Sequence, residues 1–219
     1  MNGLLVVIRR YGTSSIGRKQ IAALTGLMLV GFLCGHLAGN FLLYKGMEAF
    51  NHYSEFLQSQ TLLPVIELGL LAVFLTHICM ALWLTWENWR ARPERYEVRE
   101  SAGGRTWGSA TMIWTGLFLL GFLLFHVSTF RLIEAEDEAG IFGVVVAWFQ
   151  SVPVVVFYLC ALTALGLHLS HGVQSAFQTF GAEHPNATPV IKPAGLAFAV
   201  FLAAAFGLMP LWSHCIYRG

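Results

Sequence analysis

Four histidines lie inside apolar stretches of this chain, where an ionisable side chain costs free energy and is therefore usually functional. They are His36, His77, His126 and His168, one in each of four different stretches. A neutral imidazole can bind a metal ion through one ring nitrogen, or it can carry a proton. The four residues therefore predict metal ligation or proton transfer in an apolar medium. The alternative is helix packing, with each imidazole bonded to a backbone carbonyl.

The stretches that carry these histidines are long enough to span a membrane. The chain is 56% hydrophobic and only 11% charged, and a membrane-spanning helix needs about 20 mostly apolar residues. Five such runs occur, at about 21–43, 62–86, 107–130, 152–177 and 194–212. The sequence therefore predicts an all-α integral membrane protein with five transmembrane helices. Residues 1–219 form a single domain in this interpretation, with almost nothing left for a soluble part.

Positive charge predicts how these helices are oriented. Ten lysines and arginines lie before the first span, between the second and third, or between the fourth and fifth: Arg9, Arg10, Arg18, Lys19, Arg90, Arg92, Arg95, Arg99, Arg105 and Lys192. Only Lys45, Arg131 and Arg218 lie on the other side. Because positive residues accumulate on the cytoplasmic side, we expect a cytoplasmic N-terminus and an external C-terminus. The acidic loop with Glu134, Glu136, Asp137 and Glu138 would then be external.

Three segments outside the spans are expected to lie along the membrane surface. Residues 1–19 carry four basic residues and predict an interfacial N-terminal helix. Residues 44–61 have amphipathic spacing, and residues 141–149 are apolar but too short to cross a bilayer.

The four histidines fall at two depths. At about 1.5 Å per residue, His36 and His126 lie roughly 10 Å and 6 Å from the outer ends of their spans, whereas His77 and His168 lie roughly 14 Å from the inner ends. Each depth thus holds two imidazoles from different helices, the ligand set of a haem iron with two axial histidines. We therefore predict two haems b in a bundle of the first four helices. A proton relay would usually add acidic residues, and Glu67 lies near an outer end.

Two features qualify this ligand set. His171 follows His168 by three residues and points broadly to the same face; the depth of His168 matches that of His77, so His171 is expected beside the ligand or a haem propionate. The four cysteines form no haem-attachment motif, so the haems would be bound without a covalent link.

Gly31, Gly35 and Gly39 form a small-residue face beside His36, which favours either helix packing or room for a porphyrin edge.

Short motifs along nearly the whole chain resemble one known family. In order they are Ser14–Lys19 (SSIGRK), Thr25–Leu27 (TGL), Gly35–Asn40 (GHLAGN), Glu48–Tyr53 (EAFNHY), Ala91–Tyr96 (ARPERY), Thr106–Ser109 (TWGS), His168-x-x-x-Gly172 and Gln174–Gly181 (QSAFQTFG). Together they resemble the cytochrome b membrane-anchor subunit of succinate dehydrogenase and fumarate reductase, in its single-subunit, five-helix, di-haem form.

The resemblance implies a subunit of complex II in the inner (cytoplasmic) membrane of a bacterium. A flavoprotein subunit and an iron–sulfur subunit would bind on its cytoplasmic side, and the succinate active site would not lie in this chain. His36 and His126 would hold the distal haem, and His77 and His168 the proximal one. Electrons would pass between the iron–sulfur subunit and a membrane quinone, with menaquinone favoured. Oligomers of the whole complex and contacts with membrane lipid are expected, and nucleic acid is not.

The quinone site is less well defined by the sequence. Ser15, Arg18, Lys19 and Gln20 are candidates for a quinone carbonyl or the proximal haem propionates, with anchoring to lipid headgroups as the alternative. On the outer side, Glu48, His52 and Tyr53 are candidates for a distal site, with solvation of an interfacial helix as the alternative. Some family members carry a glutamate two residues before the ligand of the fourth span. This chain has Gly166 there, which argues against that proton route.

Two other functions compete with this interpretation. The di-haem cytochrome b subunit of respiratory nitrate reductase takes its four ligands from only two helices, whereas here they lie on four. A haem-free transporter or membrane scaffold, with packing or proton-relay histidines, is the alternative from a different class.

Overall fold

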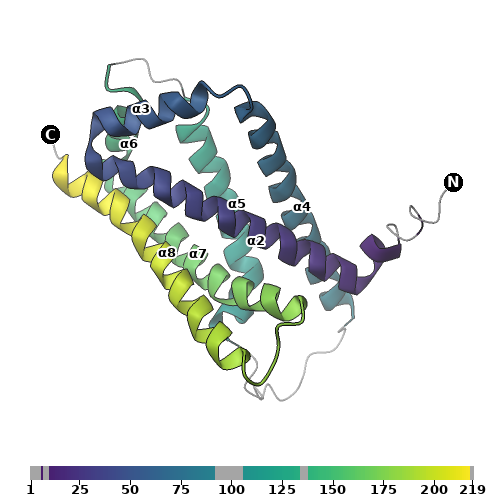
Figure 1. Cartoon of the computed structure of the whole chain (residues 1–219). Helices are drawn as coiled ribbons and strands as arrows, with labels where there is room; N and C mark the ends of the chain where they lie inside the picture. Colours follow the sequence, from purple (N-terminus) through teal and green to yellow (C-terminus); the bar gives the residue numbers. More distant parts are fainter. Residues whose placement is uncertain (1–5, 7–9, 92–105, 134–137, 218–219) are drawn as a thin grey trace.

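The protein is an assembly of long helices. The computed structural model describes residues 6, 10–91, 106–133 and 138–217, and within these residues there is no strand. The five long helices are α2 (Ser15–Asn40), α4 (Leu63–Arg90), α5 (Trp107–Phe130), α7 (Val152–Thr179) and α8 (Thr188–Ile216). All five are long and apolar enough to cross a membrane. The prediction of an all-α membrane protein with five spans is therefore confirmed (Figure 1).

Two of the long helices begin at side-chain caps. The Ser14 hydroxyl accepts a hydrogen bond of 3.0 Å from the backbone N–H of Gly17, and Thr106 and Ser109 cap one another reciprocally at the start of α5. Such caps satisfy N–H groups that have no partner within the helix. Helices α4 and α7 instead carry proline in the first turn, where the missing N–H removes no bond.

Two helices begin earlier than the predicted spans. The first long helix begins at Ser15, before the predicted start of the first span near residue 21, so residues 15–19 are helical and continuous with it. Residues 10–13 form a helical turn before it, and residues 1–5 and 7–9 lie outside the described part of the chain. The last helix begins at Thr188, before the predicted start of the fifth span near residue 194. Basic side chains such as Arg18 and Lys192 can reach the headgroups from a helical position, so a helix can extend beyond its apolar run.

The connections at the end of the bundle opposite the start of α2 contain two short helices joined by one asparagine. They are α3 (Met47–Gln58), which follows the 3₁₀ helix η1 (Phe41–Lys45), and α6 (Gly140–Phe149). The Asn51 side chain donates to the carbonyl of Ala139 at 2.8 Å and accepts from the N–H of Phe142 at 2.9 Å. Gly140 has a φ of 58°, and a Cβ there would lie 2.7 Å from the Asn51 amide nitrogen. The two short helices predicted over 44–61 and 141–149 therefore exist and contact each other.

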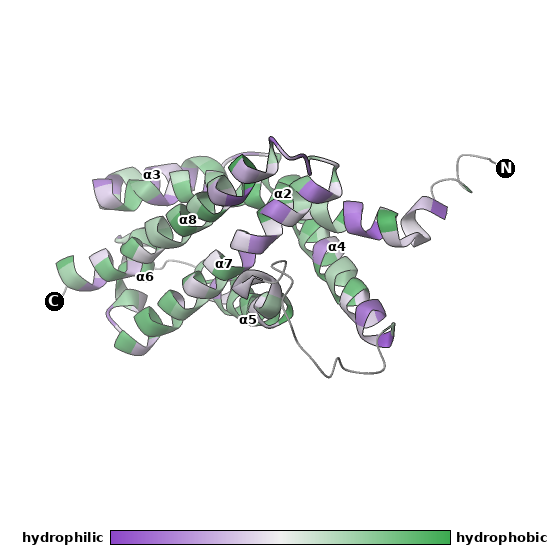
Figure 2. Cartoon of the chain, turned by 90° about the horizontal axis from the view of Figure 1, so that it is seen from below, coloured by the Kyte–Doolittle hydropathy of each residue, from purple (hydrophilic) through white to green (hydrophobic). Residues whose placement is uncertain are grey.

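The long helices pack as two pairs, α2 with α4 and α5 with α7. Helix α2 also contacts α7, which links the pairs, and α8 covers the outer side of α7 (Figure 1). The main buried cluster lies at this junction and includes Leu37, Leu169 and Leu202. Helix α4 contributes no buried residue. The long helices are mostly hydrophobic along their length (Figure 2), and many of their large apolar side chains are exposed, as expected for a chain surrounded by lipid.

An ion pair joins the two helix pairs at the end of the bundle opposite the start of α2. The Arg131 guanidinium, just after α5, binds the Glu67 carboxylate of α4 through two hydrogen bonds of 2.7 and 3.1 Å. The hydrogen bond to Glu67 raises the pKa of Arg131, so the arginine remains charged. Because both side chains are substantially exposed, the pair adds about 1 kcal/mol at most to stability.

The charges behind the predicted orientation separate to opposite ends of the bundle. Arg10, Arg18, Lys19, Arg90 and Lys192 lie at the end where α2 begins, and Lys45 and Arg131 lie at the other. Arg9, Arg92, Arg95, Arg99, Arg105 and Arg218 lie outside the described residues, as do Glu134, Glu136 and Asp137.

Asn51→Ala tests the connection between α3 and α6. The change removes two hydrogen bonds and leaves the Phe142 N–H and the Ala139 carbonyl without this partner, so we expect a loss of about 1–3 kcal/mol in unfolding free energy. Thermal unfolding of the detergent-solubilised protein measures it. The control is Gln58→Ala on the same helix, where the amide makes only a local bond to Ser54. Equal melting temperatures for the two variants would contradict the assignment.

Candidate functional site

His36 and His126 face each other across the two helix pairs. His36 lies on α2 and His126 on α5; their ring centroids are 5.8 Å apart and their planes are nearly perpendicular, at 89°. Each ring stacks on a phenylalanine four residues earlier in its own helix: Phe32 at 5.4 Å and Phe122 at 5.5 Å. The outer pair predicted from depth is thus brought together, between aromatic rings.

The two outer histidines have different polar partners. His126 Nδ1 lies 3.0 Å from the hydroxyl of Tyr158, a residue of α7 that is only 5% exposed and sits in an aromatic cluster. His36 has only contacts of 3.4 Å from both ring nitrogens to the Asn40 amide, which itself bonds the His36 carbonyl at 2.8 Å. Tyr158 therefore fixes the His126 ring, and Asn40 holds the His36 ring weakly.

His77 of α4 lies against the backbone of α2. Its Nδ1 is 3.1 Å from the carbonyl of Ala22 and 3.3 Å from the hydroxyl of Thr25. A Cβ built at Gly26 would lie 3.1 Å from His77 Cε1, so only glycine lets the ring approach without displacement. A carbonyl can only accept, so Nδ1 carries the proton and Nε2 keeps its lone pair. Nε2 is then the free metal-binding nitrogen.

His168 of α7 lies against α5 in the same way. Its Nδ1 is 3.3 Å from the hydroxyl of Thr115. A Cβ at Gly116 would lie 3.4 Å from His168 Cε1, an ordinary contact distance. His171, the competing candidate, lies beside Gly108 near the start of α5 instead.

The similar surroundings of His77 and His168 reflect an internal repeat in the sequence. Residues 25–36 read TGLMLVGFLCGH and residues 115–126 read TGLFLLGFLLFH, identical at eight of twelve positions. The repeat places a threonine and a glycine beside each inner histidine, and a phenylalanine beneath each outer one. Its alignment at an offset of 90 residues is the sequence signal that identifies Thr25, Thr115, Phe32 and Phe122. No comparable signal marks Tyr158.

The glycines near the histidines divide into two kinds. A Cβ at Gly31, Gly35 or Gly121 would meet no other part of the chain within 4 Å, whereas one at Gly39 would lie 2.7 Å from the ring of Tyr53. The small-residue face of α2 therefore serves packing at Gly39 and is open at Gly31 and Gly35. Gly166 is a packing glycine as well, since a Cβ there would lie 3.2 Å from Ala203.

The separation of His36 and His126 would allow both rings to bind one metal ion. A first-row metal binds imidazole nitrogen at about 2 Å, so an ion held between two imidazoles would place the ring centres roughly 6 Å apart, close to the 5.8 Å observed. The inner histidines lie beside Thr25 and Thr115, eleven residues before His36 and His126; that is roughly 16 Å along a helix. No group of three or more metal-binding side chains gathers in the described residues.

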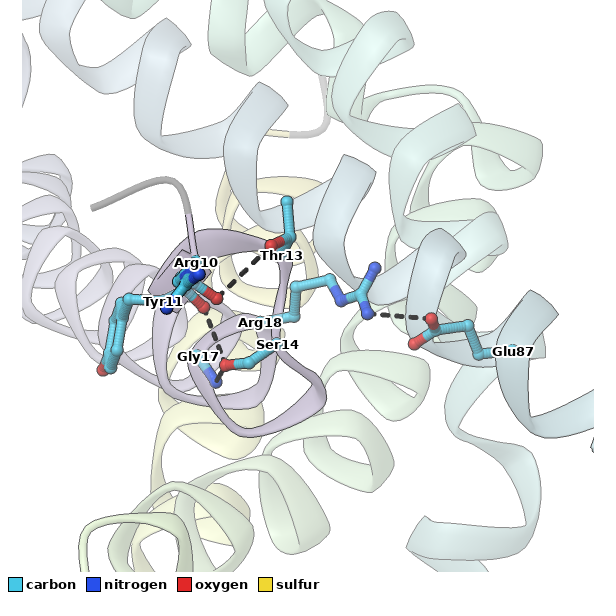
Figure 3. A network of polar contacts seen from close by, with 7 residues as sticks. All are labelled: Arg10, Tyr11, Thr13, Ser14, Gly17, Arg18 and Glu87. Atoms are coloured by element: carbon cyan, nitrogen blue, oxygen red, sulfur yellow. Dashed lines mark hydrogen bonds and ion pairs between the residues drawn. The ribbon is translucent and has the colours of Figure 1, made fainter. Parts of the chain in front are cut away.

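A polar network lies at the end of the bundle where α2 begins (Figure 3). Arg18 binds the Glu87 carboxylate of α4 at 2.9 Å, and its guanidinium lies 5.4 Å from the centre of the Trp83 ring. The Nε atom of Arg18 is buried and has no hydrogen-bond partner within the described residues. Gln20 accepts a hydrogen bond from the Tyr11 hydroxyl. The network thus links α2 and α4 and retains one unused donor.

The remaining quinone candidates are exposed or pack against a helix. Ser15 and Lys19 are exposed. On the outer side Glu48 and His52 are exposed, and Tyr53 packs against Gly39. The structure does not join these side chains into one site by any described hydrogen bond.

Comparison with protein families found one match. A family model described as "Succinate dehydrogenase/Fumarate reductase transmembrane subunit" matches residues 95–208. The match covers half of the chain and includes α5, α7 and most of α8, and so His126 and His168. Searches of curated proteins and of solved structures found no match.

Gly26→Ala and Gly31→Ala form a matched test of the inner site. Both changes should add about 1 kcal/mol of helix propensity, but only the Cβ at residue 26 meets a histidine. We expect Gly31→Ala to raise the melting temperature, and Gly26→Ala to raise it less or to lower it. Circular dichroism of the solubilised protein on heating measures this difference. If the two variants behaved alike, the close approach of His77 to α2 would be contradicted.

Proposed function

The chain belongs to the succinate dehydrogenase/fumarate reductase transmembrane subunit family, and from this we propose that it is a di-haem cytochrome b anchor of succinate:quinone oxidoreductase. In this proposal the subunit carries electrons between an iron–sulfur subunit and a membrane quinone. Membership of the family implies association with the other subunits of the complex. The haems, the quinone and the bacterial inner membrane are the parts that we propose.

One observation carries the proposal: four histidines stand on four different helices and in two layers. His36 and His126 are separated as two axial ligands would be. His77 and His168 each have Nδ1 occupied by the neighbouring helix, so each presents Nε2. A helix-packing role would not require each inner histidine to meet a threonine hydroxyl through Nδ1.

The chain's own residues supply binding, orientation and an apolar surround. Haem, when bound, supplies a one-electron redox centre whose properties depend on its axial ligands and their hydrogen bonds. The imidazoles would hold the iron, Phe32 and Phe122 would restrict the outer rings, and the long helices would exclude water. Two layers roughly 16 Å apart along the helices would give electrons a path across much of the membrane.

The end of the bundle where α2 begins is the proposed cytoplasmic side. Arg10, Lys19, Arg90 and Lys192 are exposed there and supply positive charge for docking a flavoprotein–iron–sulfur unit. Arg18 has an unused buried N–H, which supports its assignment as a donor to a quinone carbonyl or a haem propionate. Menaquinone is the proposed quinone, on the family resemblance alone.

Haem content tests the proposal directly. We expect two haems b per polypeptide in the membrane-extracted protein, measured as the pyridine haemochrome and in a reduced-minus-oxidised spectrum. His36→Ala or His126→Ala should remove the outer haem, because iron would lose an axial ligand, and His77→Ala or His168→Ala should remove the inner one. Each variant should then retain about half of the haem absorbance.

His171→Ala is the matched control, since it removes a second histidine from the same helix as His168. It should leave both haems bound. Loss of the inner haem in this variant but not in His168→Ala would overturn the ligand assignment. A folded protein from haem-replete cells that contains no haem would overturn the cytochrome proposal and favour a transporter or scaffold.

A further inference from the structure

We propose that Thr25 and Thr115 are equivalent positioning residues for the inner histidine pair. Each hydroxyl holds Nδ1 of a histidine on the neighbouring helix, so that Nε2 points away from that helix toward the haem iron. The inference rests on the proposed function, because the iron is what the oriented nitrogen would bind. It adds two residues on α2 and α5 that are not themselves ligands.

The hydrogen bonds of Thr25 determine its role. Its hydroxyl donates to the carbonyl of Ile21 at 2.8 Å, so the oxygen faces His77 with its lone pairs. The Nδ1–H of His77 is therefore shared between two acceptors, the Ala22 carbonyl at 3.1 Å and the Thr25 hydroxyl at 3.3 Å. Two acceptors on one helix fix both the tautomer and the direction of the ring.

Thr115 repeats this arrangement on the other helix pair. Its hydroxyl donates within α5, to the carbonyls of Thr111 at 3.0 Å and Met112 at 3.1 Å. Its oxygen lies 3.3 Å from His168 Nδ1, and Met112 occupies the repeat position of Ala22. The same donor–acceptor logic leaves Nε2 of His168 free.

An intrahelical bond alone does not distinguish these threonines. Thr76, Thr85 and Thr163 also donate to the carbonyl four residues earlier, at 2.7 to 2.8 Å, and none of them has a described histidine contact. Thr25 and Thr115 are each only 7% exposed, contact an imidazole, and occupy the same position of the repeat. Packing explains their burial, but it does not explain the shared contact with Nδ1.

The outer histidines, His36 and His126, have no described threonine partner at Nδ1, so the inference predicts an effect on one haem only. His126 has the Tyr158 hydroxyl at Nδ1, and His36 has only the long contacts to Asn40. Removing a hydroxyl at Thr25 or Thr115 should therefore affect the inner haem alone. Because a hydrogen bond from Nδ1–H to an acceptor raises the basicity of the ligand nitrogen, its loss should favour ferrous iron and raise the midpoint potential of that haem.

The test compares Thr25→Val and Thr115→Val with Thr25→Ser and Thr115→Ser in the full chain within its complex. Valine keeps the shape and removes the hydroxyl, whereas serine keeps the hydroxyl. Electron paramagnetic resonance of the ferric protein reports the relative orientation of the two axial imidazoles, and a redox titration reports the potential. We expect the valine variants to shift the inner-haem signal and raise its potential, the serine variants to resemble wild type, and the outer haem to stay unchanged.

Thr85→Val on α4 and Thr163→Val on α7 are the controls, since each loses an intrahelical hydroxyl bond without touching a histidine. Valine variants with wild-type signals and potentials at both haems would overturn the inference. If the valine variants do not fold, the serine variants provide the test. Serine keeps the hydroxyl, so serine variants that change the signal or the potential of the inner haem would show that the hydroxyl is not the positioning group.

A second readout separates this inference from the proposed function. Imidazole ¹⁵N chemical shifts, measured in haem-free protein labelled at histidine, report which ring nitrogen carries the proton. We expect the Nδ1–H tautomer at His77 and His168 in wild type and a mixture of tautomers at His168 in Thr115→Val. In Thr25→Val we expect His77 to keep the Nδ1–H tautomer, because the Ala22 carbonyl still accepts from it, so for this residue the haem signal is the readout. A wild-type protein that binds no haem but shows this pattern would contradict the proposed function and leave the positioning role standing. The Nε2–H tautomer at either histidine would contradict the positioning role itself.

Discussion

The structure depends on how an imidazole is satisfied inside an apolar helix bundle. Within lipid, a buried N–H without an acceptor costs several kcal/mol. In each inner histidine that N–H meets a threonine hydroxyl on the adjacent helix, and in His77 it also meets a backbone carbonyl. The contact of His77 requires its ring to lie against the helix backbone, which Gly26 permits. Nδ1 is thereby hydrogen-bonded within the bundle, and Nε2 remains available to bind a metal ion.

The same constraint accounts for the arrangement of the helices in pairs. Each pair consists of one helix with the TGL-x-L-x-GFL-x-x-H repeat and one helix that contributes an inner histidine: α2 with α4, and α5 with α7. Both repeat helices carry their own outer histidine further along. Each pair therefore contributes one imidazole to each layer, so a site with two ligands forms only where the two pairs meet.

Hydropathy and charge made the spans and the histidines predictable, because both are properties of single segments. The helices that begin at Ser15 and Thr188 extend beyond the predicted spans, since arginine and lysine near a membrane surface do not end a helix. Thr25, Thr115 and Tyr158 were not predicted as partners of histidine, because each acts across a helix–helix contact that a hydropathy pattern does not contain. For the threonines, the internal repeat identifies them as partners of histidine from the sequence. Tyr158 is surrounded by aromatic residues of three helices, and only the packing of these helices identifies it as the partner of His126.

Helix α4 shows how the proposed cofactor and the fold would depend on each other. It has no buried residue and packs mainly on α2, while its links at the two ends are ion pairs, Arg18 with Glu87 and Arg131 with Glu67. The Arg131–Glu67 pair is substantially exposed and contributes little by itself, and the less exposed Arg18–Glu87 pair joins α4 only to α2. The position of α4 relative to α5 and α7 is therefore set weakly by protein contacts. A group that binds His77 and His168 together would join α4 to α7 directly, and any ligand that binds only the folded chain stabilises it. Haem at the inner layer would thus complete the bundle as well as carry electrons, and haem supply would influence how much folded subunit accumulates.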